Sequence, residues 1–332
     1  MVLQAPLLRL LHRRYGAPCK LLTFGAWSRP LYSNSEDIQA IWQLRLRHAP
    51  YPLSPERWSL VRELRRHEGP VYVSEDIPIH VDRIRRLLNR AGIPASRCVF
   101  LDDCSSSAEH WVDKLLEFGC VTPKALSEAD FPWRDADLRR APELDVHPDD
   151  REDCNAWLER KLLAGTRIVL LQPGNKRTNR RIASRKGHDS KAWPSERWAA
   201  LIHAIRATDQ SFRVVLCGSV QERSLLEEIR SMSAFADTTV VATKDLPIRR
   251  LMALAQQAHS MVGVDTGPLH IAGAVGCPLV VLYGAESPAR WDRRSPNGSA
   301  VVNLGGPPRT SVADVALDEV VGAWRGISAT AV

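Results

Sequence analysis

The sequence predicts an α/β protein built from doubly wound parallel sheets, and three observations support this prediction. Short apolar runs of strand length alternate with segments of helical periodicity along most of the 332 residues. In residues 260–284 a strand, a tight turn, a short helix and a second strand follow one another, which is half of a βαβ crossover. Polar residues suited to binding a ligand follow several strands, at the edge where doubly wound sheets bind nucleotides.

The first half of the chain is expected to begin with a helix. Residues 1–15 carry leucines at helical spacing, and the run ends at Arg13-Arg14-Tyr15-Gly16. The elements predicted after it are strands at 20–24, 38–44, 70–74 and 97–101, and helices at 55–67, 81–91 and 110–118. Residues 119–147 are rich in Pro, Asp and Arg and have weak periodicity, so the linker is placed there and the first domain is predicted to span 1–147.

The second half has the clearer alternation, and residues 148–311 are predicted to form a second domain. The elements expected in it are helices at 149–163, 195–207, 221–231, 247–258 and 269–274, and strands at 167–171, 212–217, 239–241, 261–264 and 278–283. Residues 312–324 have helical periodicity, and this C-terminal segment, 312–332, could cross back onto the first domain.

Composition indicates a globular protein without a membrane span. Hydrophobic residues make up 44% and charged residues 25%, and no apolar run approaches the ~20 residues that cross a bilayer. The N-terminal helix is interrupted by polar residues and lacks a convincing cleavage site, so we expect no signal peptide and a cytoplasmic location. The seven cysteines are scattered without a Cys-x-x-Cys pair, which indicates neither a disulfide framework nor a zinc site.

A formal charge of +7 favours an anionic partner: nucleic acid, an acidic membrane surface or a phosphorylated glycolipid. The charge does not choose among them. No helix-turn-helix, zinc-finger or RNA-recognition signature accompanies it, so a nucleic-acid partner is not expected. The paired arginines along the chain are interpreted as solvated helix faces.

The turn at Asp265-Thr266-Gly267-Pro268 is the strongest candidate for a ligand site. A cap-type residue, a hydroxyl, a glycine and a proline suited to the first helical turn predict a helix start directly after a strand. The backbone N–H groups of Thr266 and Gly267 would then face a phosphate, and His270, one turn along, could add a proton-dependent contact. A bland alternative is a turn in which Asp265 only caps and His270 only packs.

A longer pattern resembles a known family. Asp265-Thr-Gly-Pro-Leu-His270, then Gly276-Cys-Pro, Tyr283-Gly284 and Ser287-Pro-Ala-Arg-Trp291, resembles the glycosyltransferase family 9 signature of ADP-heptose:lipopolysaccharide heptosyltransferases. Upstream, Lys191-Ala-Trp-Pro-Ser-Glu-Arg-Trp198 is similar to the family's Lys-x-Trp-Pro-x-x-Arg-Trp entry into a helix. The resemblance covers the second half closely and the first half only at its opening helix.

The resemblance implies a GT-B-like fold, with two Rossmann-type domains facing a central cleft. It implies an inverting, metal-independent transfer of heptose from ADP-heptose, the substrate, to a lipopolysaccharide inner-core acceptor, without a cofactor. No Asp-x-Asp motif is expected in the chain, and basic groups with the helix dipole would replace Mg²⁺. Contact with the inner membrane surface is a further possibility.

Roles follow residue by residue. By resemblance Lys191 would reach the donor phosphates, Thr266 and Gly267 would cradle them, His270 would assist, and Asp265 would orient the turn or touch the sugar. Glu222 would accept from a ribose hydroxyl. For Lys191 the alternative is a solvent-exposed lysine, and for Glu222 it is a favourable interaction with the helix dipole. Trp193, Trp198 and Trp291 are interpreted as packing residues.

The N-terminus departs from the family pattern. In the family a strand ending in Gly-Asp precedes a segment like residues 2–15, and that aspartate is the general base on the acceptor hydroxyl. Here Met1 stands where the strand should just have ended. We therefore expect an incomplete N-terminus, with the catalytic base lying before Met1. The alternatives kept open are a family 9 transferase with another glycan or protein acceptor, and a catalytically silent nucleotide-binding protein.

A basic tract lies between the turn after residue 172 and Lys191. Its charge would suit the donor diphosphate or a phosphorylated lipopolysaccharide, and a solvated loop is the alternative. The tract comprises Lys176, Arg177, Arg180, Arg181, Arg185 and Lys186, followed by Gly187 and His188.

Overall fold

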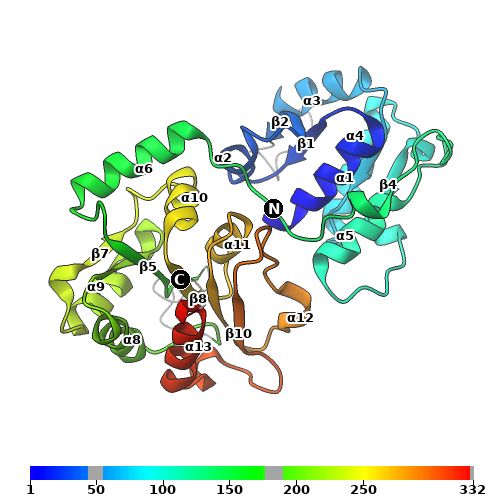
Figure 1. Ribbon diagram of the computed structural model, residues 1–332. Coiled ribbons are helices and arrows are strands. Elements are labelled where there is room, and N and C mark those ends of the chain that lie inside the picture. Colours follow the sequence, from blue (N-terminus) through cyan, green and yellow to red (C-terminus); the bar gives the residue numbers. More distant parts are fainter. Residues whose placement is uncertain (44–54, 176–189, 330–332) are drawn as a thin grey trace. The chain divides into compact units, whose positions relative to one another are not determined.

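The chain forms two α/β units. The computed structural model describes residues 1–43, 55–175 and 190–329. Unit 1 comprises Leu3–Arg140 and unit 2 Ala141–Val332, so the division follows Arg140, whereas the sequence places the domain boundary after residue 147. Figure 1 labels the elements of both units.

In its described residues, unit 1 contains two separate pairs of parallel strands. β1 pairs with β2 and β3 pairs with β4, where the sequence predicts one doubly wound sheet without its first strand. The elements are α1 Ala5–Tyr15, β1 Cys19–Thr23, α2 Ser28–Tyr32, β2 Ile38–Gln43, α3 Pro55–Arg65, β3 Val71–Val73, α4 Pro78–Ala91, β4 Cys98–Phe100 and α5 Trp111–Cys120.

The two strand pairs of unit 1 share their hydrophobic cores. Leu22 of β1 and Phe100 of β4 pack in one cluster with residues of α3 and α4. Cys19 of β1 and Val99 of β4 pack in a second cluster with residues of α1 and α5. Because successive strand residues point to opposite faces, the pairs lie in one layer between these two groups of helices.

Unit 2 contains one six-stranded parallel sheet with the order β10-β9-β8-β5-β6-β7. Its elements are α6 Pro148–Arg160, β5 Arg167–Gln172, α8 Ser195–Thr208, β6 Phe212–Cys217, α9 Arg223–Met232, β7 Thr239–Ala242, α10 Ile248–Gln257, β8 Ser260–Val264, α11 Gly267–Ala274, β9 Leu279–Tyr283, α12 Pro288–Trp291, β10 Val301–Gly305 and α13 Leu317–Ala329. The sequence does not predict β10, whose partly exposed residues at the sheet edge give a weak apolar signal.

Helices cover the unit 2 sheet. α8, α9 and α13 share one large apolar cluster with the sheet, while α10 packs against α6 and α11, and α11 contacts β8 and β9. In α13, Val320, Trp324 and Ile327 are buried in the unit 2 cluster. That the C-terminal segment crosses back onto the first domain remains a prediction.

Among the helices that the structure describes, none is long and apolar enough to span a bilayer. All seven cysteines are free thiols, as the scattered spacing predicts.

Candidate nucleotide diphosphate site in unit 2

The unit 2 sheet has a topological switch point between β5 and β8. Numbered along the chain within this unit, the strands lie in the order 3-2-1-4-5-6, with β5 first and β8 fourth. In such sheets the connections leave β5 and β8 in opposite directions, and the crevice at their carboxyl ends binds nucleotides. Gln172 pairs with Gly263 near the ends of these strands, so the turn beginning at Asp265 lies at that crevice.

The first turn of α11 presents backbone donors without a side-chain cap. Thr266 is the N-cap residue, but its Oγ1 donates to the carbonyl of Val264 at 3.1 Å instead of accepting from the helix. Pro268 has no N–H, and the N–H of His270 already donates to the Thr266 carbonyl. The N–H groups of Gly267 and Leu269, at the positive end of the helix dipole, are therefore suited to an anion.

The space in front of this turn is open at Gly267. A Cβ added there would meet no atom within 4 Å. At Gly174, on the same sheet edge, a Cβ would lie 2.1 Å from Glu222 Oε1, and at Gly284 it would lie 2.5 Å from the carbonyl of Ser190. The protein fills the space beside those two glycines and leaves it free beside Gly267.

Lys191 lies at the same turn, 74 residues away along the chain. Its Nζ is 2.8 Å from Asp265 Oδ2, and both side chains are partly buried, with 18% and 11% exposure. The structure therefore brings together Lys191, Asp265, Thr266 and Gly267, as the sequence predicts for a donor site. The alternative prediction, that Lys191 is exposed to solvent, is wrong.

Arg293 is a member of this cluster that the sequence reasoning missed. Its Nη2 is 2.7 Å from Asp265 Oδ1 and 3.3 Å from the carbonyl of Thr266. It stands beside Arg294 in a short basic run, and nothing in the local pattern distinguishes the buried arginine from its neighbour. Burial alone would raise the pKa of Asp265, but the charges of Arg293 and Lys191 outweigh it and lower the pKa, so the carboxylate is ionised.

Glu222 has a capping role in this structure. Its Oε2 accepts from the backbone N–H and the hydroxyl of Ser219, each at 2.7 Å, and the residue is 4% exposed. The carboxylate also packs on Gly174, and in this way it joins the ends of β5 and β6. This is the favourable helix-start interaction that the sequence offers as the alternative. The contact with a ribose remains a prediction.

The other predicted residues fall in three groups. His270 is partly buried in the first turns of α11, near the cluster along the chain. Trp193 and Trp198 are buried and pack edge to face with ring centroids 4.9 Å apart, so their interpretation as packing residues is confirmed. The basic tract from Lys176 to His188 lies outside the described residues.

The expectation of no Asp-x-Asp motif is wrong, because the chain contains the tripeptide Asp135-Ala-Asp137 in unit 1. Asp137 accepts from the backbone N–H of Arg134 at 3.3 Å and forms an ion pair with Arg13 at 3.5 Å. These contacts are those of a capped turn. Within the described ranges, no three His, Cys, Asp or Glu side chains are grouped as a metal site would require.

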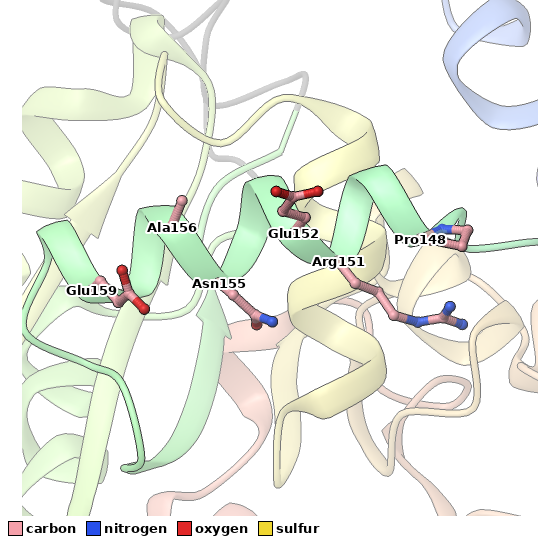
Figure 2. A pocket seen from close by; sticks show the side chains of 6 residues that line it. All are labelled: Pro148, Arg151, Glu152, Asn155, Ala156 and Glu159. Carbon is pink, nitrogen blue, oxygen red and sulfur yellow. The ribbon is translucent and has the colours of Figure 1, made fainter.

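A shallow hollow of about 560 Å³ lies away from these residues, along α6. Figure 2 shows that all of its lining side chains come from that one helix. Residues on a single helix face form an open surface, and none of the predicted donor residues lines it. We therefore place the candidate site at the start of α11 and not in this hollow.

Comparisons with known proteins agree with this fold. Residues 169–315 match the model of the family described as glycosyltransferase family 9 (heptosyltransferase). A lipopolysaccharide heptosyltransferase 3 of Escherichia coli is 32% identical over 129 residues, 38% of this chain and 34% of that relative. A lipooligosaccharide heptosyltransferase 2 of Haemophilus influenzae is 24% identical over 272 residues, 79% of this chain and 73% of that relative.

A solved structure extends the likeness to nearly the whole fold. The E. coli ADP-heptose lipopolysaccharide heptosyltransferase II superposes with a TM-score of 0.73 at 18% identity, and the match covers 99% of this chain and 95% of that one. The chain therefore has a GT-B-like fold. Residues 169–315, somewhat less than half of the chain, are similar to glycosyltransferase family 9, the heptosyltransferase family. The E. coli heptosyltransferase 3 match spans about a third of the length of that relative.

Proposed function

We propose that the chain transfers heptose from ADP-heptose to an inner-core sugar of lipopolysaccharide, with inversion and without a metal ion. In this reaction the bond from the anomeric carbon to the diphosphate breaks and ADP leaves, while the oxygen of an acceptor hydroxyl bonds to that carbon and gives its proton to a general base. The names of the family and its relatives support the sugar and the acceptor.

The observation that carries the proposal is the cluster at the start of α11. Negative charge grows on the diphosphate as the leaving-group bond breaks, and preorganised donors stabilise it best in a site shielded from water. Lys191 supplies a positive charge here, and Gly267 and Leu269 supply uncapped N–H groups. These groups replace the metal ion that many nucleotide-sugar enzymes would place at the diphosphate.

Isothermal titration calorimetry with ADP, UDP and GDP tests the donor site. ADP should bind selectively. Lys191→Ala should weaken the binding of ADP by about 10- to 100-fold, because a charge-assisted contact to phosphate is lost. Thr266→Val should cost only about 2- to 5-fold, since the hydroxyl donates to Val264 and orders the turn without facing the ligand.

Lys244→Ala is the matched control. Lys244 is an exposed lysine after β7, three strands from β8 in the same sheet, and its removal changes the net charge equally. If both lysine variants weaken the binding of ADP to the same extent, the effect is a general electrostatic one and the site assignment fails. If a folded wild-type chain binds no nucleotide, the proposal itself fails. A transfer assay with ADP-heptose and heptose-deficient lipopolysaccharide then tests the acceptor, and donor binding without transfer would contradict that part.

A further inference from the structure

The guanidinium of Arg293 is buried beneath the first turn of α11. Its side chain is 1% exposed, and it donates to Asp265, to the carbonyls of Thr266 and Trp291, and to the hydroxyl of Tyr283. Burial raises the pKa of Tyr283 to about 12, so that hydroxyl keeps its proton and stays a neutral partner of the arginine. Four acceptors on three segments fix the guanidinium in one position.

Asp265 therefore has two cationic partners that differ in exposure. Arg293 contacts Oδ1 from a closed environment, while Lys191 contacts Oδ2 with 18% of its side chain exposed. A carboxylate that is nearly buried cannot lose its only cation without a large energetic penalty. With two cations present, one can leave and the carboxylate remains neutralised.

We infer that Arg293 is a positioning residue of the donor site: it keeps Asp265 neutralised so that Lys191 can leave the carboxylate and bind the donor diphosphate. The inference rests on the proposed function, because it concerns how Lys191 becomes available to the nucleotide. Arg293 itself lies below the turn and does not touch the ligand.

A structural role for Arg293 is the competing explanation, and two observations argue against it. Buried ion pairs add little net stability compared with apolar residues of the same size. In addition, the Nε of Arg293 is buried without a hydrogen-bond partner in the part of the chain that the structure describes, which is unfavourable for folding. If Arg293 served stability alone, its buried Nε would be expected to have a hydrogen-bond partner.

The test is a double-mutant cycle read by ADP titration, with Arg293→Gln and Lys191→Ala alone and combined. Arg293→Gln should weaken the binding of ADP by about tenfold or more, because Lys191 then remains paired with Asp265 and does not reach the diphosphate. In the Lys191→Ala background the same change should cost less than about twofold, since no lysine remains to be released. Arg293→Lys should recover part of the affinity, because it restores the charge without the planar fork.

Three outcomes separate the possibilities. Equal losses in both backgrounds, or no loss in a folded Arg293→Gln protein, would overturn the inference and leave the proposed donor site intact. Absence of ADP binding in the wild type would overturn the proposed function instead. If Arg293→Gln does not fold, the cycle is run with Arg293→Met, which removes the charge and fills the buried space with an apolar side chain. ADP affinity unchanged by Arg293→Met would then overturn the inference.

Discussion

Replacing Gly267 with valine is expected to weaken ADP binding by on the order of 100-fold or more while leaving the unfolding temperature within about 2 °C of the wild type. Gly267 is exposed, its φ lies outside the positive range, and its missing Cβ faces open space. The valine side chain would therefore not strain the protein. It would occupy the space that the diphosphate needs beside the N–H groups of Gly267 and Leu269.

Calorimetric ADP titration and a thermal unfolding curve check this prediction together. Gly322→Val is the matched control, since Gly322 is an exposed residue of α13 with no atom within 4 Å of its missing Cβ. That variant should bind ADP like the wild type. Undiminished ADP affinity in Gly267→Val would mean that the diphosphate binds elsewhere, and a large drop in unfolding temperature would mean that the space is not open.

The sequence predicts the unit 2 site well where the signals are local. The signals for β8, α11 and β9 all lie within 25 residues. They include a proline near the start of α11 and a glycine after its end, and the structure forms these three elements as expected. Lys191 could be placed because its Trp-Pro context resembles a family motif. Its distance to Asp265 follows from the adjacency of β5 and β8, which fixes the ends of these strands side by side.

What the sequence could not predict depends on contacts between distant segments. Arg293 lies 28 residues after Asp265 and reaches it only because β8 and β9 are neighbours and the chain returns beneath α11. The capping contact of Glu222 and its packing on Gly174 likewise join two strand ends. In unit 1, the pairing of β1 with β2 and of β3 with β4 depends on hydrogen bonds between different strands. Periodicity within one segment does not predict which strands pair.

Trp324→Ala is expected to lower the free energy of unfolding by about 3–5 kcal/mol, the range for deleting a fully buried aromatic side chain. Trp324 is 0% exposed, packs edge to face on Phe212 at 5.5 Å, and donates from Nε1 to Ser260 Oγ at 3.0 Å. For a unit of this size the loss should reduce the unfolding temperature by roughly 6–20 °C. Urea unfolding measures the change in the free energy of unfolding, and thermal unfolding measures the change in unfolding temperature.

Trp324→Phe separates packing from hydrogen bonding. Phenylalanine keeps most of the apolar contact with Phe212 and loses the bond to Ser260, so about 1–2 kcal/mol should be lost. ADP affinity at 10 °C, where both variants are expected to remain folded, should match the wild type, because Trp324 packs in the apolar core of unit 2. A loss below about 1 kcal/mol for Trp324→Ala would contradict the burial of α13 on the unit 2 sheet, since a cavity of that size cannot form in a packed core without a cost. Reduced ADP affinity in a folded variant would instead show that α13 supports the carboxyl edge of the sheet as well as its core.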